Sequence, residues 1–221
     1  MSAPNALTSS PLVRLLDGWA SAPSADPGGD LAERWSQWLG PLDAVRLQAA
    51  QQSIRAMPVE RAAPAPAAAR ALADELQKLQ ASLSATLQQA QPAETGETGF
   101  APYRRRHTEL QRLMATAIAP LRARLRQALA RVAGPLRQLA ALDALLEQQL
   151  DAHEHKLLAT VPAHLEQRFK QLHAQASDDA APTALRFEQD WRAAMLAELD
   201  LRLQPLHGLL EALKNEHPAK P

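Results

Sequence analysis

The sequence predicts an all-α protein, an elongated antiparallel helical bundle or coiled coil with a small N-terminal helical region. Two observations carry this prediction. Leucines recur at steps of three and four residues along most of the chain, a spacing that places them on one face of a helix. Aromatic residues make up only 4% of the chain, while Leu, Ala, Gln, Arg and Glu dominate it. That composition is typical of long helices that pack through narrow leucine seams.

Residues 1–56 are predicted to form the small N-terminal helical region. Ser10 followed by Pro11 indicates a helix start, because proline fits the first helical position, and this helix should end near Gly18. After a loop rich in proline and glycine, a capping box at residues 30–33 starts a second helix. Trp35 and Trp38 lie on one face of that helix. They either pack inside the protein or form a docking site for a partner.

Residues 57–69 are predicted to be a linker rich in proline and alanine, because its three prolines disfavour a regular helix. The long helical bundle then occupies residues 70–213, and residues 214–221 are predicted to be a disordered tail. A loop at residues 91–99 can reverse the chain after the first of these helices. That helix carries a leucine stripe made of Leu72, Leu76, Leu79, Leu83 and Leu87.

Further helices follow Tyr103, Pro135, Pro162 and Thr183. Prolines divide or bend them, because proline cannot donate a backbone hydrogen bond. We expect a kink at Pro120, a helix boundary at Gly134 and Pro135, and a bend at Pro205. The helix after Pro135 continues the apolar pattern through Leu136, Leu139, Leu142, Leu146, Leu150, His153 and Leu157.

A formal net charge of zero conceals a strongly basic segment. Residues 103–137 contain nine arginines and one acid, a net charge of +8, whereas residues 138–221 carry −5. One interpretation is neutralisation by acidic helices of the same chain or of a second copy. The other is a basic stripe that is open to an anionic partner, either nucleic acid or an acidic protein surface. A solvated face without a partner is the third.

The candidate partner-binding residues are the tryptophan pair and the aromatic and basic residues of this segment. On a helical wheel the arginines fall away from the apolar stripe, so we expect them at the surface. Arginines at a helix start also oppose the helix dipole, which predicts an acidic neighbour such as Asp190, Glu198 or Asp200. The candidates are Trp35, Trp38, Tyr103, Arg104, Arg105, Arg106, Arg112, Arg122 and Arg126.

Motifs for chemistry are sparse, so we expect no catalytic residue, no cofactor, no bound metal and no small-molecule substrate. His153 and His155 are two positions apart, and such side chains diverge on a helix instead of sharing a metal. The chain has no cysteine and no long apolar run, which excludes disulfides and a membrane-spanning segment. Without the pattern of a secretory signal at its start, a cytoplasmic location is the expectation.

Four strings resemble a proteobacterial family known as the domain of unknown function 3348 family. They are residues 35–40 (WSQWLG), 100–106 (FAPYRRR), 159–162 (ATVP) followed by 165–169 (LEQRF), and 197–205 (AELDLRLQP). The resemblance extends from about residue 12 to residue 213. It implies a bacterial helical protein without an assigned activity, whose relatives accompany envelope proteins, and it transfers no catalytic residue.

These observations predict a non-enzymatic adaptor or assembly protein. It would act through protein contacts, as an oligomer or as part of an envelope-associated complex. The alternative is a nucleic-acid-binding regulator that uses the basic helix at residues 103–131.

Overall fold

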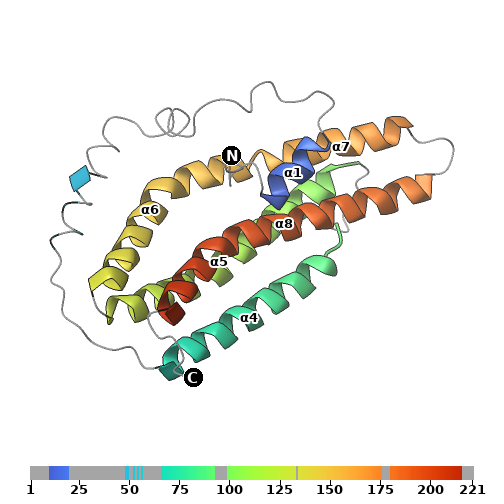
Figure 1. Ribbon diagram of the computed structural model, residues 1–221. Helices are drawn as coiled ribbons and strands as arrows, with labels where there is room; N and C mark the ends of the chain where they lie inside the picture. Colours follow the sequence, from blue (N-terminus) through green and yellow to red (C-terminus); the bar gives the residue numbers. More distant parts are fainter. Residues whose placement is uncertain are drawn as a thin grey trace, which may run out of the picture. The chain divides into compact units, whose positions relative to one another are not determined.

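The computed structural model describes residues 10–19, 48, 49, 52, 54, 56, 66–92, 99–132, 134–175 and 180–215. These residues form six helices and no strand, so the all-α prediction is confirmed (Figure 1). The more specific expectation of an elongated bundle or coiled coil stays a prediction. The helices are α1 (Pro11–Asp17), α4 (Pro66–Gln88), α5 (Ala101–Ala130), α6 (Gly134–Leu158), α7 (Val161–Gln175) and α8 (Ala180–Asn215).

Prolines mark several of the helix starts. Pro11 opens α1 as predicted, although the Ser10 side chain makes no capping hydrogen bond. The predicted boundary at Gly134 is also confirmed, because α6 begins there. The expectation that residues 66–69 are linker is wrong, since α4 begins at Pro66. Proline at a first helical position loses no hydrogen bond that the helix would otherwise make.

Two other prolines lie inside helices. Pro120 is within α5 and Pro205 is within α8, and both helices continue past them. Each proline removes one backbone donor, so the carbonyl group four residues earlier has no helical partner. The bends that we predicted at these two positions stay predictions.

The chain packs as two compact units, and each unit draws on separate stretches of sequence. The described part of unit 1 contains α1, α4 from Leu79, α5 up to Ala117, α7, and α8 up to Leu203. Unit 2 contains α4 up to Lys78, α5 from Ile118, α6 up to Lys156, and α8 from Gln204. The division of the chain into consecutive domains, predicted above, stays a prediction.

An aromatic cluster forms part of the core of unit 1. Tyr103 lies edge-on to Phe187 and to Trp191, with ring centroids 4.9 and 5.5 Å apart. Phe100 and Phe169 complete the cluster, which therefore takes in every phenylalanine and the single tyrosine of the chain. Such edge-to-face pairs add to the stabilisation that comes from burial alone. Five of the eight aromatic residues of the chain thus lie together at one place.

Helix α1 packs against α7 at the edge of unit 1 (Figure 1). The Gln171 side chain donates a hydrogen bond to the carbonyl oxygen of Trp19, and the Arg168 guanidinium lies over the Trp19 ring at 5.8 Å. Arg168 also donates to Asp190 of α8 at 2.7 Å. These contacts join α1, α7 and α8 through side chains that are far apart in sequence.

Unit 2 has an aliphatic core. Leucines of α4, α5, α6 and α8 are buried there, as their periodic spacing predicts. An ion pair between Glu75 and Arg124 links α4 to α5 at the surface. Within the described ranges, no helix is both long enough and apolar enough to span a bilayer. The buried leucines are Leu72, Leu76, Leu121, Leu125, Leu129, Leu136, Leu206, Leu209, Leu210 and Leu213.

Candidate functional site

The aromatic and basic residues at the start of α5 make contacts within unit 1. Tyr103 is buried in the aromatic cluster. Burial and the nearby Glu188 carboxylate raise the pKa of Tyr103, because both disfavour the phenolate, and Arg192 only partly opposes this. The predicted partner-binding role of Tyr103 would therefore require the core to open.

Arg104 and Arg106 each have an acidic neighbour, as the helix-dipole argument predicted, but not one of the three named residues. Arg104 pairs with Glu166 of α7 and lies over the Phe100 ring at 5.6 Å. Arg106 pairs with Glu109, one turn further along α5, at 3.0 Å. Hydrogen bonding to Lys170 and the charges of Lys170 and Arg104 lower the pKa of Glu166. These pairs are exposed, so water screens them and each contributes little to stability.

Arg105 and Arg112 complete the basic residues of the first half of α5. Both side chains are exposed. Arg105 has an interaction partner in the chain. Arg112 forms no ion pair with any of the residues that the structure describes. Arg112 is therefore the candidate residue whose charge is most open to a partner.

Arg122 and Arg126 join α5 to α6 in unit 2. Arg122 makes two hydrogen bonds to Asp143, from Nε to Oδ2 at 2.9 Å and from Nη2 to Oδ1 at 2.7 Å. Arg126 donates to Asp143 at 3.2 Å, and both arginines also pair with Glu147. This fork geometry is the strong form of an arginine and carboxylate contact.

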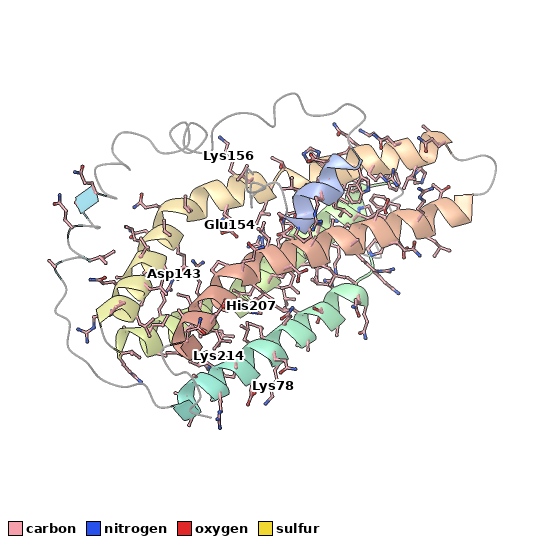
Figure 2. The ribbon with its side chains drawn as sticks, in the orientation of Figure 1. Lys78, Asp143, Glu154, Lys156, His207 and Lys214 are labelled. Atoms are coloured by element: carbon pink, nitrogen blue, oxygen red, sulfur yellow. The ribbon has the colours of Figure 1, made fainter. Side chains whose placement is uncertain are left out.

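The expectation that all these arginines lie at the surface is wrong for Arg122 and Arg126. The Arg122 side chain is only 14% exposed, and that of Asp143 only 11%. Burial opposes the charge of Arg122, but hydrogen bonding and attraction to Asp143 and Glu147 outweigh it, so the pKa of Arg122 is raised. Figure 2 shows Asp143 and Glu154 along one edge of the α6 ribbon and Lys156 beyond the other. The basic segment is thus neutralised within the chain at this point.

Unit 1 contains a buried polar network that the sequence analysis missed. His107 of α5 and Glu198 of α8 are both fully buried, and His107 Nε2 lies 3.4 Å from Glu198 Oε2. Gln111 Nε2 donates to the same oxygen at 3.0 Å and to the Leu158 carbonyl at 3.2 Å. Arg202 donates to Glu198 Oε1 from Nε at 3.0 Å. The carboxylate is therefore held from three directions.

Glu198 stays ionised although it is buried. Burial by itself would raise its pKa, but the close approach of His107, the hydrogen bond from Gln111 and the charge of Arg202 outweigh that effect and lower the pKa of Glu198. The signal for this network was present in the sequence. His107 occupies the apolar stripe of Tyr103, Leu110 and Met114, and a polar residue in such a stripe needs a buried partner.

Some nitrogen atoms of this core lack a hydrogen-bond partner among the described residues. Both ring nitrogens of His107 and Nε1 of Trp191 lie buried without a partner in hydrogen-bond geometry. His107 Nε2 therefore lies close to Glu198 without the alignment of a hydrogen bond. Because His107 and Glu198 are fully buried, a substrate cannot touch them in this structure. The network can stabilise helix packing, but it offers no accessible group for chemistry.

Helix α6 differs from its neighbours in that most of its leucines are incompletely buried. Of its eight leucines, only Leu136 and Leu158 are buried. Leu142 is 37% exposed, and the leucines at one and two turns from it are only half-buried. We name four of them the α6 seam: Leu139, Leu142, Leu146 and Leu150.

Other predicted features are placed as follows. Trp35 and Trp38 lie outside the described residues. His155 is exposed, and the described residues include no group of three acidic or histidine side chains that could hold a metal ion. Asp200 is exposed, and Asp190 pairs with Arg168 instead of with the basic start of α5.

The comparison with protein families gives a match over nearly the whole chain. A family model described as "Protein of unknown function (DUF3348)" matches residues 2–215. Neither the curated proteins nor the solved structures include a significant match to the chain.

Proposed function

Because this chain belongs to the DUF3348 family, whose description assigns no activity, we propose its function from its geometry. It is a non-enzymatic helical adaptor or assembly protein that acts through protein–protein contacts. The single observation that carries this proposal is the incomplete burial of the α6 seam in unit 2. The resemblance to a family whose members accompany envelope proteins makes an envelope-associated complex the first place to look for a partner.

The α6 seam is incompletely buried, and the ion pairs between α6 and α5 use a different face of α6. Asp143 and Glu147 point toward the arginines of α5, and the leucines lie to one side of this contact. A leucine gains about 1.5–3 kcal/mol when it moves from full exposure to full burial. Four incompletely buried leucines in a row thus favour a further protein surface as cover.

The ion pairs of α5 favour a protein partner over nucleic acid. Arg104, Arg106 and Arg122 have carboxylate partners within the chain, as do Arg124 and Arg126. A phosphate backbone would have to compete with those carboxylates. Binding of nucleic acid gains affinity from cations that are free to neutralise phosphates, and these five are already neutralised.

Affinity capture from the native cell tests the proposal. Tagged wild-type protein is compared with Leu146→Glu and with the matched control Leu185→Glu, which changes an exposed leucine of α8. Nuclease treatment and moderate salt remove contacts that depend on nucleic acid. We expect a discrete protein to be recovered with the wild type and the control and to be lost with Leu146→Glu.

A different outcome would support the alternative. Recovery of nucleic acid alone, abolished when Arg104, Arg105 and Arg106 are replaced by Ala, would contradict the adaptor proposal. It would instead indicate the nucleic-acid-binding regulator.

A further inference from the structure

We infer that the buried polar network of unit 1 fixes the register between α5 and α8, and that it selects one pairing of these helices more than it stabilises them. The network consists of His107, Gln111, Glu198 and Arg202. Three features carry this inference: the uniform apolar surface beside the network, the contacts that the network makes between helices, and the free-energy cost of burying it.

The apolar side chains on either side of the network do not distinguish one register from the next. Leu110 and Met114 of α5, and Met195 and Leu199 of α8, are at most 1% exposed. In each helix the leucine and the methionine lie four residues apart, which is about one helical turn. Methionine adapts to different neighbours, and apolar cores of the right volume lose a unique arrangement before they lose stability. These contacts bury surface without fixing the position of α8 along α5.

Contacts at two levels establish that α5 and α8 run in the same direction within unit 1. Tyr103 lies edge-on to Trp191, and one turn further along α5 the Nε2 atom of His107 lies 3.4 Å from Oε2 of Glu198. Gln111, a turn beyond His107, donates to the same oxygen at 3.0 Å. The Glu198 carboxylate therefore marks one level of α8 against two successive turns of α5.

A slide of α8 by one turn would break this arrangement. It would bring either Ala194 or Arg202 to the level of His107 in place of Glu198, depending on the direction. In neither case would the Glu198 carboxylate keep the contacts with both His107 and Gln111. A buried carboxylate that loses its partners is costly, so the polar residues penalise the registers that the apolar residues tolerate.

The members of the network divide the work between charge and position. Arg202 lies one turn after Glu198 on the same helix and donates to its Oε1 at 3.0 Å. It moves together with Glu198, so it neutralises the carboxylate without fixing where α8 lies. Gln111 also donates to the carbonyl oxygen of Leu158, the last residue of α6, at 3.2 Å. Gln111 thus positions both α8 and the end of α6 relative to α5.

The network achieves this at a cost in stability. His107 and Glu198 are fully buried, and both ring nitrogens of His107 lack a hydrogen-bond partner among the described residues. Removal of one member of a buried charged set is destabilising, whereas replacement of the whole set by apolar side chains of similar volume is often neutral or stabilising. The gain is specificity, because a polar residue within an apolar seam favours the pairing that gives it a partner.

Spin-label distances test the register, and the natural absence of cysteine allows specific labelling. Arg112→Cys on α5 and Leu185→Cys on α8 place the labels at exposed positions of unit 1. Because Tyr103 packs against Trp191, the two labels are about 22 Å apart along the helix axes. Pulsed electron paramagnetic resonance should give one narrow distance when the network is intact.

The test variant replaces the whole network by apolar side chains in the same labelled chain. We expect its urea midpoint to equal or exceed that of the intact network, and a second distance to appear that differs by roughly the 5.4 Å rise of one turn. The matched control, Met114→Leu with Met195→Leu, changes the apolar neighbours only and should keep the single distance. The test variant carries His107→Leu, Gln111→Leu, Glu198→Met and Arg202→Met.

Two results would overturn the inference. A single, unchanged distance in the test variant would assign the register to the aromatic contacts of Tyr103 and Trp191. A urea midpoint well below that of the intact network would show that the network contributes net stability instead of specificity. If circular dichroism shows that the test variant has lost its helices, the smaller change His107→Leu with Glu198→Met is measured by the same two criteria, and loss of helix there also contradicts the inference.

Discussion

Each unit contains a network of oppositely charged side chains, and the two networks differ in how deeply they are buried. In unit 1, His107 and Glu198 are completely buried, and Gln111 and Arg202 occupy both carboxylate oxygens of Glu198. In unit 2, Arg122, Arg126, Asp143 and Glu147 form a fork that keeps partial contact with water. A buried carboxylate is costly to leave alone, whereas water compensates part of the loss at a half-exposed one. The depth of each network therefore decides how strongly the protein depends on it.

The buried network should give the largest effect. Glu198→Ala removes the buried carboxylate that faces Arg202 and His107, so each of these side chains loses a charged neighbour in the core. We expect a loss of about 3–5 kcal/mol in the free energy of unfolding, measured by urea denaturation. Glu211→Ala, at an exposed position of α8, is the control. A loss below about 1 kcal/mol would show that the burial of Glu198 does not increase its contribution to the free energy of unfolding.

The fork in unit 2 should give a smaller effect. Asp143→Ala removes two hydrogen bonds from Arg122 and one from Arg126, but both guanidinium groups can still reach Glu147 and water. We expect a loss of about 2 kcal/mol in the same urea experiment. Asp74→Ala, at an exposed position of α4, should change nothing measurable. A loss equal to that of Glu198→Ala would remove the distinction between the two networks.

Acid should weaken unit 1 through Glu198. Its pKa is lowered in the folded protein below the ordinary value of 4.5, so the folded state binds this proton less tightly than the unfolded state does. The resulting stability is present above the ordinary pKa and is lost as the pH falls through the folded one. Urea denaturation between pH 7 and pH 3 should show a shallower pH dependence for Glu198→Gln than for the wild type. Equal slopes would assign the acid sensitivity to other groups.

Alkali should act on the same unit through Tyr103, with a smaller effect. The pKa of Tyr103 is raised, so its contribution is complete below the ordinary value of 10.0 and is lost as the pH rises through the folded value. Tyr103→Phe keeps the ring in the aromatic cluster and removes the ionisable group. The variant should lose less stability above pH 10 than the wild type in thermal unfolding. A wild-type loss that persists in the variant would contradict this assignment.

The smallest effect should come from the exposed pair of Arg104 and Glu166. Water screens it, and Lys170 can still pair with Glu166 when Arg104 is absent. Arg104→Ala should therefore leave the urea midpoint unchanged within error. A clear shift would mean that the contact of Arg104 with the Phe100 ring matters more than its ion pair.

The sequence predicted the helices better than the contacts of their polar residues. The leucine stripe of α4 is largely buried, with Leu76 and Leu87 almost inaccessible, because periodic spacing depends only on local geometry. The partners of Arg122 and Glu198 come from other helices, so no local pattern could identify them. His107 could have been recognised as a polar residue within an apolar stripe. The incomplete burial of the α6 seam could not have been recognised, since its leucines repeat as regularly as those that are buried.

The composition of the two units has a consequence for protein synthesis. Unit 1 includes residues of both α4 and the first half of α8, and unit 2 includes both the start of α4 and the end of α8. A chain emerging from the ribosome therefore lacks a complete version of either unit until α8 has been made. Domains formed from one continuous stretch can fold in order as they emerge. Here the apolar residues of α4, α5 and α6 cannot be fully buried before α8 has been made. Nascent chains should therefore depend on chaperones until translation is nearly finished.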